Sequence, residues 1–171
     1  DVVTHYAGKV KSWDVVNEAV DDNGGVMRNT IFLQRMGPNY VKDCFQWARE
    51  AATAAGDTSL LLFYNDYATS ANTAKQNKVF SIVDDLKTPN VIDGVGFQMH
   101  NTYLSPTKAQ IETDLNKAVA KGLKIHVSEL DIQVNQSNDI SSFTNERRLA
   151  QKEKYKEMVK IYNALPAANK Y

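Results

Sequence analysis

The sequence lacks several features that would indicate particular classes of protein. Its one cysteine, Cys44, excludes an internal disulfide and a cysteine-rich zinc site. Its three histidines are scattered without the spacing of metal ligands, and no apolar run approaches the ~20 residues that a membrane span needs. There is no excess charge either, because 20 Lys and Arg residues balance 20 Asp and Glu residues. We therefore expect neither a nucleic acid nor a membrane as partner, since both favour a basic surplus.

The chain also begins with aspartate and has no basic-then-apolar leader. We expect it to be a processed or excised piece, so the missing leader says nothing about compartment. With 43% hydrophobic and 23% charged residues, its composition is that of an ordinary globular protein. No linker or repeat interrupts it, and residues 1–171 are expected to belong to one domain.

Four short apolar runs alternate with segments of helical periodicity. The runs cover residues 10–17, 60–64, 91–98 and 123–130, and apolar stripes lie over residues 41–55, 79–86, 111–119 and 155–165. This alternation predicts parallel strands joined by right-handed crossovers. Two α/β architectures fit, a doubly wound open sheet and part of an eight-fold barrel, of which four units would be half. The Asp-Asn-Gly-Gly stretch at residues 22–25 lacks the spacing of a dinucleotide-binding loop.

Polar side chains gather where each predicted strand ends. In parallel α/β proteins, functional groups cluster at the carboxyl ends of the strands. Polar residues at all four ends predict a shared cleft, and they are Asn17, Glu18, Asn65, Asp66, Gln98, His100, Glu129 and Asp131.

Two of these side chains, Glu18 and Glu129, suit cleavage of a glycosidic bond. One carboxyl group must be protonated to donate to the leaving oxygen, and the other must be ionised to attack or stabilise the anomeric carbon. From spacing alone, the alternative stays open that each glutamate only ends a strand or pairs with a nearby cation.

Four motifs resemble glycoside hydrolase family 10, the endo-β-1,4-xylanases. The sequence SWDVVNEA at residues 12–19 resembles the family's acid/base motif, and HVSELDI at residues 126–132 resembles its nucleophile motif. YNDY at residues 64–67 and GVGFQMH at residues 94–100 match two further signatures in the family's order. The resemblance implies a (β/α)8 TIM barrel, incomplete in this chain, which would carry its fourth to seventh strands.

The resemblance also implies a mechanism and its residues. Glu18 would be the general acid/base and Glu129 the nucleophile of a retaining double displacement, with their carboxyl groups ~5 Å apart. Asn17 would donate to the 2-hydroxyl of the sugar, and Asn65 would support the nucleophile. Tyr67 resembles the aromatic residue that stacks beside the leaving-group sugar. No metal or cofactor is expected.

Strand alternation assigns directions to the remaining side chains. Gln98 and His100 have the same parity, so both should face the cleft and contact substrate. The family pattern places His100 between Glu129 and Asp131, where it would orient the nucleophile. His126 has the opposite parity to Glu129 and is predicted to face the helix layer.

The family's first three strands and its last strand have no counterpart in this sequence. We expect these segments to lie on another stretch of polypeptide and the isolated chain to be inactive, poorly soluble or self-associating, because open sheet edges stay uncovered. The function predicted is hydrolysis of xylan or xylo-oligosaccharides outside the cell. The alternatives are a non-catalytic xylan-binding remnant and another TIM-barrel β-1,4-glycanase.

The sequence departs from the family pattern at Ala68, where the family commonly has asparagine.

Overall fold

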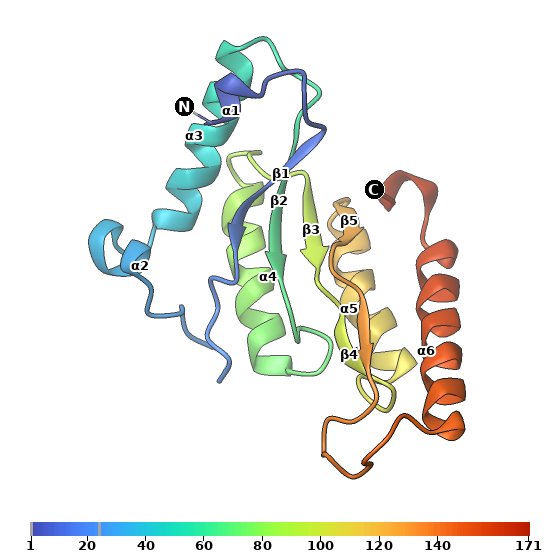
Figure 1. The fold of residues 1–171 in the computed structure, drawn as a ribbon. Helices are drawn as coiled ribbons and strands as arrows, with labels where there is room; N and C mark the ends of the chain where they lie inside the picture. The colour runs from blue at the N-terminus through green and yellow to red at the C-terminus, as the bar shows by residue number, and fades with distance from the viewer. Residues whose placement is uncertain (1, 24) are drawn as a thin grey trace.

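The computed structural model describes residues 2–23 and 25–171 (Figure 1). Asp1 and Gly24, the latter in the polar stretch at residues 22–25, lie outside the described residues. The main sheet has four parallel strands in the order β1-β2-β3-β5. These strands are β1 (Ser12–Asn17), β2 (Leu61–Asp66), β3 (Gly94–Phe97) and β5 (Lys124–Val127).

Four helices follow the strands where the periodicity predicts them, and they are α3 (Tyr40–Ala54), α4 (Thr73–Lys87), α5 (Lys108–Ala120) and α6 (Asn145–Ala164). The short helix α1 (Val2–His5) precedes the first strand, α2 (Ile31–Met36) lies in the segment after β1, and the 3-10 helix η1 (Ala167–Asn169) follows α6. Side chains of Asn72, Thr107 and Thr144 cap the first turns of α4, α5 and α6. In the described part of the chain, no helix has the length and apolar character needed to cross a bilayer.

The order of the strands decides between the two architectures left open by the sequence. Each new strand is added on the same side of the preceding one, so right-handed crossovers place the helices on one face of the sheet. A doubly wound sheet would require the strand order to reverse. The arrangement is therefore that of consecutive units of a barrel.

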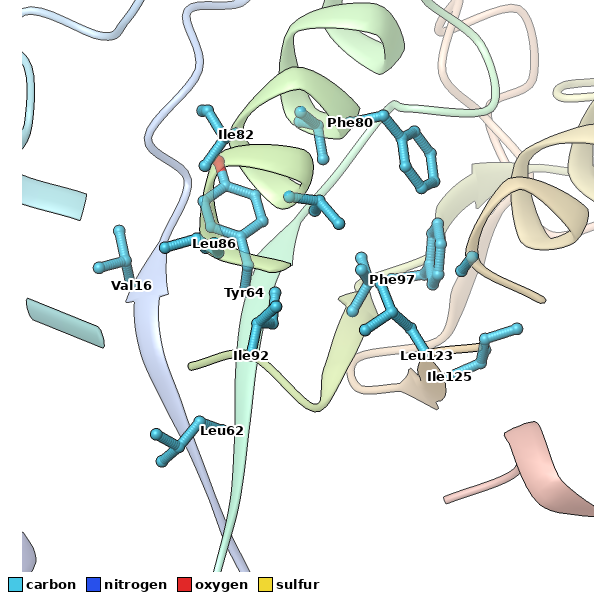
Figure 2. Close-up of a cluster of buried hydrophobic side chains, with 14 of the residues drawn as sticks. Val16, Leu62, Tyr64, Phe80, Ile82, Leu86, Ile92, Phe97, Leu123 and Ile125 are labelled. Atoms are coloured by element: carbon cyan, nitrogen blue, oxygen red, sulfur yellow. The ribbon is translucent and has the colours of Figure 1, made fainter. Parts of the chain in front are cut away.

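Alternating side chains of the strands form the core against the helices. Figure 2 shows Tyr64 of β2 near Ile82 and Leu86 of α4, and Phe97 of β3 near Phe80. Leu62, Tyr64 and Leu86 are fully buried. Burial of apolar surface stabilises a protein by about 25 cal/mol per Å², so this layer is the main source of stability.

The opposite face of the sheet carries the polar residues. In the strand register, Asn17 lies beside Asn65, Asn65 beside Gly96, and Gly96 beside His126. Residues that pair in this way share a face, so this row crosses the sheet on the side away from the helices.

A second, two-stranded parallel sheet, which the sequence did not predict, continues from the carboxyl end of the first. It pairs β4 (His100–Thr102) with β6 (Asp131–Gln133), and His100 lies opposite Asp131. The strand expected to run through residue 98 stops at Phe97, because Met99 adopts a positive φ of 60° that breaks the extended backbone.

The main sheet does not close into a barrel and so has two edges. β1 is one edge, and β5 is the other. After α6, the chain returns to β5, where Lys170 forms a parallel bridge with Ile125 and the Tyr171 amide donates to the Ile125 carbonyl. The edge of β5 therefore accepts further parallel pairing.

Candidate active site

Glu18 lies in a sharp turn directly after β1. Its φ of 54° is in the left-handed region, which few residues other than glycine adopt. The Glu18 amide donates to the Asn65 carbonyl over 2.9 Å, and the Ala19 amide donates to the Tyr64 hydroxyl over 3.1 Å. The turn directs the Glu18 side chain, which is 31% exposed, toward the polar row of the sheet.

Amide side chains connect Glu18 to Glu129. Gln98 Nε2 donates to Glu18 Oε1 over 3.0 Å and to Asn17 Oδ1 over 3.1 Å. Asn65 Nδ2 donates to the same Asn17 oxygen over 2.9 Å and to Glu129 Oε1 over 3.0 Å. The two carboxylates thus lie at the ends of one hydrogen-bonded network, built from the four strand ends that the sequence singled out.

Glycine at position 96 makes room for this network. A Cβ atom there would lie 2.2 Å from Asn65 Oδ1, so any side chain would displace the Asn65 amide. Asn65 Oδ1 also accepts a hydrogen bond of 2.8 Å from the Ser128 hydroxyl, which fixes which way the amide is turned. Asn65 therefore presents its nitrogen to Asn17 and Glu129.

His100 lies between two carboxylates. Its Nε2 is 3.2 Å from Glu129 Oε2, and its Nδ1 contacts Asp131 Oδ2. The hydrogen bond with Asp131 raises the pKa of His100 above its ordinary value, and the Glu129 carboxylate raises it further. His100 is thereby biased toward the cationic form that pairs with Glu129.

A cationic cluster, which sequence reasoning missed, lies on the Glu18 side. Arg28 Nη1 is 3.5 Å from Glu18 Oε2, and Arg28 Nη2 donates to the Tyr67 hydroxyl over 2.8 Å and to Asp22 over 3.1 Å. The Tyr67 hydroxyl also contacts Asp22. The guanidinium therefore ties the loop after β1 both to Glu18 and to the loop after β2.

The second cation of this cluster is the fully buried Lys75. Its ammonium group forms a 3.0 Å salt bridge with Asp66, which is 1% exposed, and lies 3.5 Å from the centroid of the Tyr67 ring. Asp66, which the sequence placed at a strand end beside the cleft, is thus part of the buried helix-side layer. No local spacing signals these partners, because 39 residues separate Arg28 from Tyr67 and 53 separate Asp22 from Lys75.

Three of the residues predicted to bind substrate line one pocket. Tyr67, Gln98 and His100 all contribute to its wall, together with the loop segments that follow β2 and β3. Lys75 and Arg28 both lie over the Tyr67 ring, 3.5 Å and 5.7 Å from its centroid, so cations occupy part of the surface on which a planar group could stack.

The prediction for His126 was wrong. Its row in the sheet is that of Asn65 and Gly96, so it faces away from the helices. Its ring contacts Phe63, with centroids 5.8 Å apart, and Tyr171, with centroids 5.2 Å apart. Parity counted from Glu129 fails because β5 ends at Val127 and the alternation does not continue past that point.

Comparison with protein families and curated proteins gives a consistent result. The sequence model of glycosyl hydrolase family 10 matches residues 1–170. Endo-beta-1,4-xylanase Xyn10C from Cellvibrio japonicus is 39% identical over 94% of this chain and 28% of its own length. Endo-1,4-beta-xylanase B from Thermotoga neapolitana is 40% identical over 76% of this chain and 36% of its own, and Exoglucanase XynX from Acetivibrio thermocellus is 38% identical over 89% and 13%.

Solved structures agree with this result. Native xylanase 10C from Cellvibrio japonicus has a TM-score of 0.88 and 37% identity, covering 99% of this chain and 37% of the neighbour. Xylanase 10B from Thermotoga petrophila RKU-1, solved with xylobiose, has a TM-score of 0.86 and 34% identity, covering 99% and 49%. This chain thus spans less than half the length of these relatives, whose fold is a (β/α)8 barrel. The chain belongs to glycosyl hydrolase family 10, and its sheet is an incomplete (β/α)8 barrel.

Proposed function

We propose that this chain carries the catalytic segment of a retaining endo-β-1,4-xylanase, with Glu18 as general acid/base and Glu129 as nucleophile. The observation that supports this most strongly is the amide network that ends on one carboxylate at each side. Two carboxyl groups flanking one sugar are what a double displacement at an anomeric carbon requires. The xylanase relatives supply the substrate class, xylan or xylo-oligosaccharides.

In the first step, Glu18 donates its proton to the glycosidic oxygen while a Glu129 carboxylate oxygen attacks the anomeric carbon. The bond to the leaving sugar breaks, and an ester forms between Glu129 and the remaining xylan chain. The Arg28 guanidinium, 3.5 Å from Glu18, stabilises the carboxylate that Glu18 becomes.

In the second step, Glu18 removes a proton from water as the water oxygen attacks the same anomeric carbon. The ester bond to Glu129 breaks, and Glu129 leaves as a carboxylate. Two inversions at one carbon restore the original configuration. Glu18 recovers its proton, and the cycle closes.

The neighbouring side chains orient this chemistry. Asn17 turns its oxygen toward Gln98 and Asn65, so its nitrogen is directed elsewhere and is free to donate to a sugar 2-hydroxyl. Asp131 holds the His100 ring, which in turn orients Glu129. The Tyr67 ring would stack on the leaving-group sugar.

Residues 1–171 are, in this proposal, part of a catalytic domain whose remaining strands lie on another polypeptide segment. The open edges of β1 and β5 and the span of less than half of the relatives support this. The isolated chain should be inactive, poorly soluble or self-associating, because the edge of β1 is open and Lys170 and Tyr171 cover only part of β5. A stable, active monomer of the isolated chain would contradict this proposal. The assembled domain below means the chain combined with those strands.

We further propose that the enzyme acts outside the cell. Xylan is a polymer too large to enter cells intact, so an endo-acting enzyme must meet it there. Export of the protein by its source cell, followed by activity in the medium, would support this, and retention inside the cell would contradict it.

Azide tests the two roles directly. In the assembled domain, Glu129→Ala should lose activity on aryl xylobiosides and regain it with azide, which takes the place of the nucleophile and gives an α-glycosyl azide. Glu18→Ala should instead give the β-glycosyl azide, because azide attacks the Glu129 ester. Exchange of these two products between the variants, or azide products from neither, would contradict the assignment.

The alternatives predict other outcomes. A non-catalytic remnant would bind xylan equally well with and without the two glutamates and would release no reducing ends. The exoglucanase relative favours a trial of β-1,4-glucan as a second substrate. A higher kcat/KM on glucan than on xylan would favour a different β-1,4-glycanase.

A further inference from the structure

The backbone at Glu18 requires a specific support. A left-handed φ costs a residue with a side chain about 1–2 kcal/mol, and such conformations persist only where the surroundings hold them. Two hydrogen bonds fix the turn, one at the Glu18 amide and one at the Ala19 amide. The second bond goes to a side chain, the Tyr64 hydroxyl, and it is buried.

The hydrogen bonds of the Tyr64 hydroxyl are fixed by its buried surroundings. Tyr64 is fully buried on the helix side of β2 (Figure 2). Its hydroxyl donates to Asp66 Oδ2 over 2.7 Å, which leaves its lone pairs to accept from Ala19. Burial raises the pKa of Tyr64 well above its ordinary value, and Asp66 raises it further, so the hydroxyl keeps its proton.

Asp66 is itself held by a buried cation. Its other oxygen pairs with Lys75 over 3.0 Å and accepts the Tyr67 amide over 2.8 Å. The series Lys75, Asp66, Tyr64 and Ala19 therefore runs from a buried charge pair to the residue next to Glu18. Removal of the Tyr64 hydroxyl would break it at the step nearest the site.

We propose that Tyr64 is a positioning residue for the general acid, acting through the Ala19 amide to hold the turn that aims the Glu18 carboxyl group. The inference rests on the proposed role of Glu18. The Tyr64 ring then packs in the core, while its hydroxyl separately holds the turn that orients the proton donor. Tyr64→Phe separates these parts, since it keeps the ring and removes the hydroxyl.

Proton transfer can be read from the leaving group. Dinitrophenolate leaves without a proton, whereas phenol and a sugar hydroxyl need one. In the assembled domain, Tyr64→Phe should lower kcat/KM for phenyl xylobioside and xylan by about 10- to 100-fold and change that for 2,4-dinitrophenyl xylobioside by about two-fold or less. The ratio of the two kcat/KM values does not depend on how much of the preparation is folded, so partial unfolding cannot imitate the result.

Tyr162 offers a matched control. Its hydroxyl also accepts a backbone amide, that of Tyr171 over 3.1 Å, and donates to a backbone carbonyl over 2.5 Å. Tyr162→Phe should leave the ratio of the two kcat/KM values unchanged. Equal losses on both substrates in Tyr64→Phe, or no loss on either, would overturn the inference.

The same comparison of leaving groups, applied to Glu18→Ala, separates this inference from the proposed function. Glu18→Ala should show the strongest dependence on the leaving group. If it does and Tyr64→Phe does not, the positioning role of Tyr64 is wrong and the role of Glu18 stands. If Glu18→Ala shows no such dependence, the proposed function itself fails.

Discussion

The two ends of the site are supported in different ways. Glu18 rests on the interior of the protein, through the buried Tyr64, Asp66 and Lys75. Glu129 is 42% exposed and is held by Asn65 and by the exposed His100. A proton donor needs a fixed direction toward one oxygen, whereas a nucleophile needs open space for the sugar, so the two supports suit the roles proposed for Glu18 and Glu129.

The charges at the two ends also differ in kind. Arg28, which pairs with Glu18, keeps its charge across the ordinary pH range. The charge of His100, near Glu129, depends on pH, and its hydrogen bond with Asp131 raises its pKa above the ordinary value. The surroundings of Glu129 therefore change with pH, while those of Glu18 do not.

The largest expected effect separates the two glutamates by substrate. In the assembled domain, Glu129→Ala should lower kcat/KM by about 10⁴-fold or more on every substrate, because no ester can form. Glu18→Ala should lower it by about 10²- to 10⁴-fold on xylan and little on dinitrophenyl xylobioside. Equal losses for the two variants on both substrates would remove the distinction between the ends.

The buried salt bridge between Lys75 and Asp66 should contribute more to stability than exposed ion pairs do. Lys75→Met leaves Asp66 as an unpaired buried charge and should lower the free energy of unfolding by about 3–5 kcal/mol. The control is Lys156→Met, whose pair with Glu153 is exposed and should cost about 0–1 kcal/mol. Urea unfolding of both variants measures the difference. Similar losses of stability in the two variants would mean that the buried Lys75–Asp66 pair contributes no more than an exposed pair.

The exposed support should show itself through pH. Because its pairing with Asp131 raises the pKa of His100, folding favours the protonated ring. That stabilisation is fully present below the ordinary histidine pKa of about 6.5 and is lost as pH rises through the raised value in the folded protein. His100→Gln should therefore lower the thermal midpoint at acidic pH and progressively less at higher pH.

Arg28→Gln is the comparison for His100→Gln, since a guanidinium does not titrate in this range. Its change in thermal midpoint should not diminish as pH rises, because Arg28 keeps its charge while its partner Glu18 becomes ionised. A change for His100→Gln that does not diminish with pH either would contradict the difference in charge between the two ends.

The smallest expected effect lies in the loop that carries Tyr67. Ala68 has a φ of 58°, a conformation that asparagine tolerates better than alanine. Ala68→Asn should raise the free energy of unfolding by about 0.5–1 kcal/mol. Ala55→Asn, at an exposed position with a φ of −83°, provides the control. A gain for Ala68→Asn no larger than that of the control would show that the strained turn is not the cause.

The sequence predicted the strands, the four main helices and the ends of the strands that meet. These depend on local periodicity and on motifs with fixed spacing. It did not predict β4 and β6, which depend on the turn at Met99. It placed His126 on the wrong face, because it counted alternation beyond the end of β5.

The partners of Glu18 could not be predicted in the same way. Tyr64 reads as an ordinary core residue, and Lys75 as a polar residue in the first turn of a helix. Their roles arise from contacts across the fold, such as the 45 residues between Ala19 and Tyr64. No local pattern encodes such a contact.

The central claim is that Glu129 bonds to the sugar while Glu18 transfers the proton. A 2-fluoro-xylobioside with a good leaving group slows both steps, but the second more, so the glycosyl-enzyme accumulates. After incubation with the assembled domain and digestion, mass spectrometry should find the added sugar on the peptide that carries Glu129. A label on the peptide that carries Glu18, or an enzyme that turns over unlabelled with inverted product, would contradict the account.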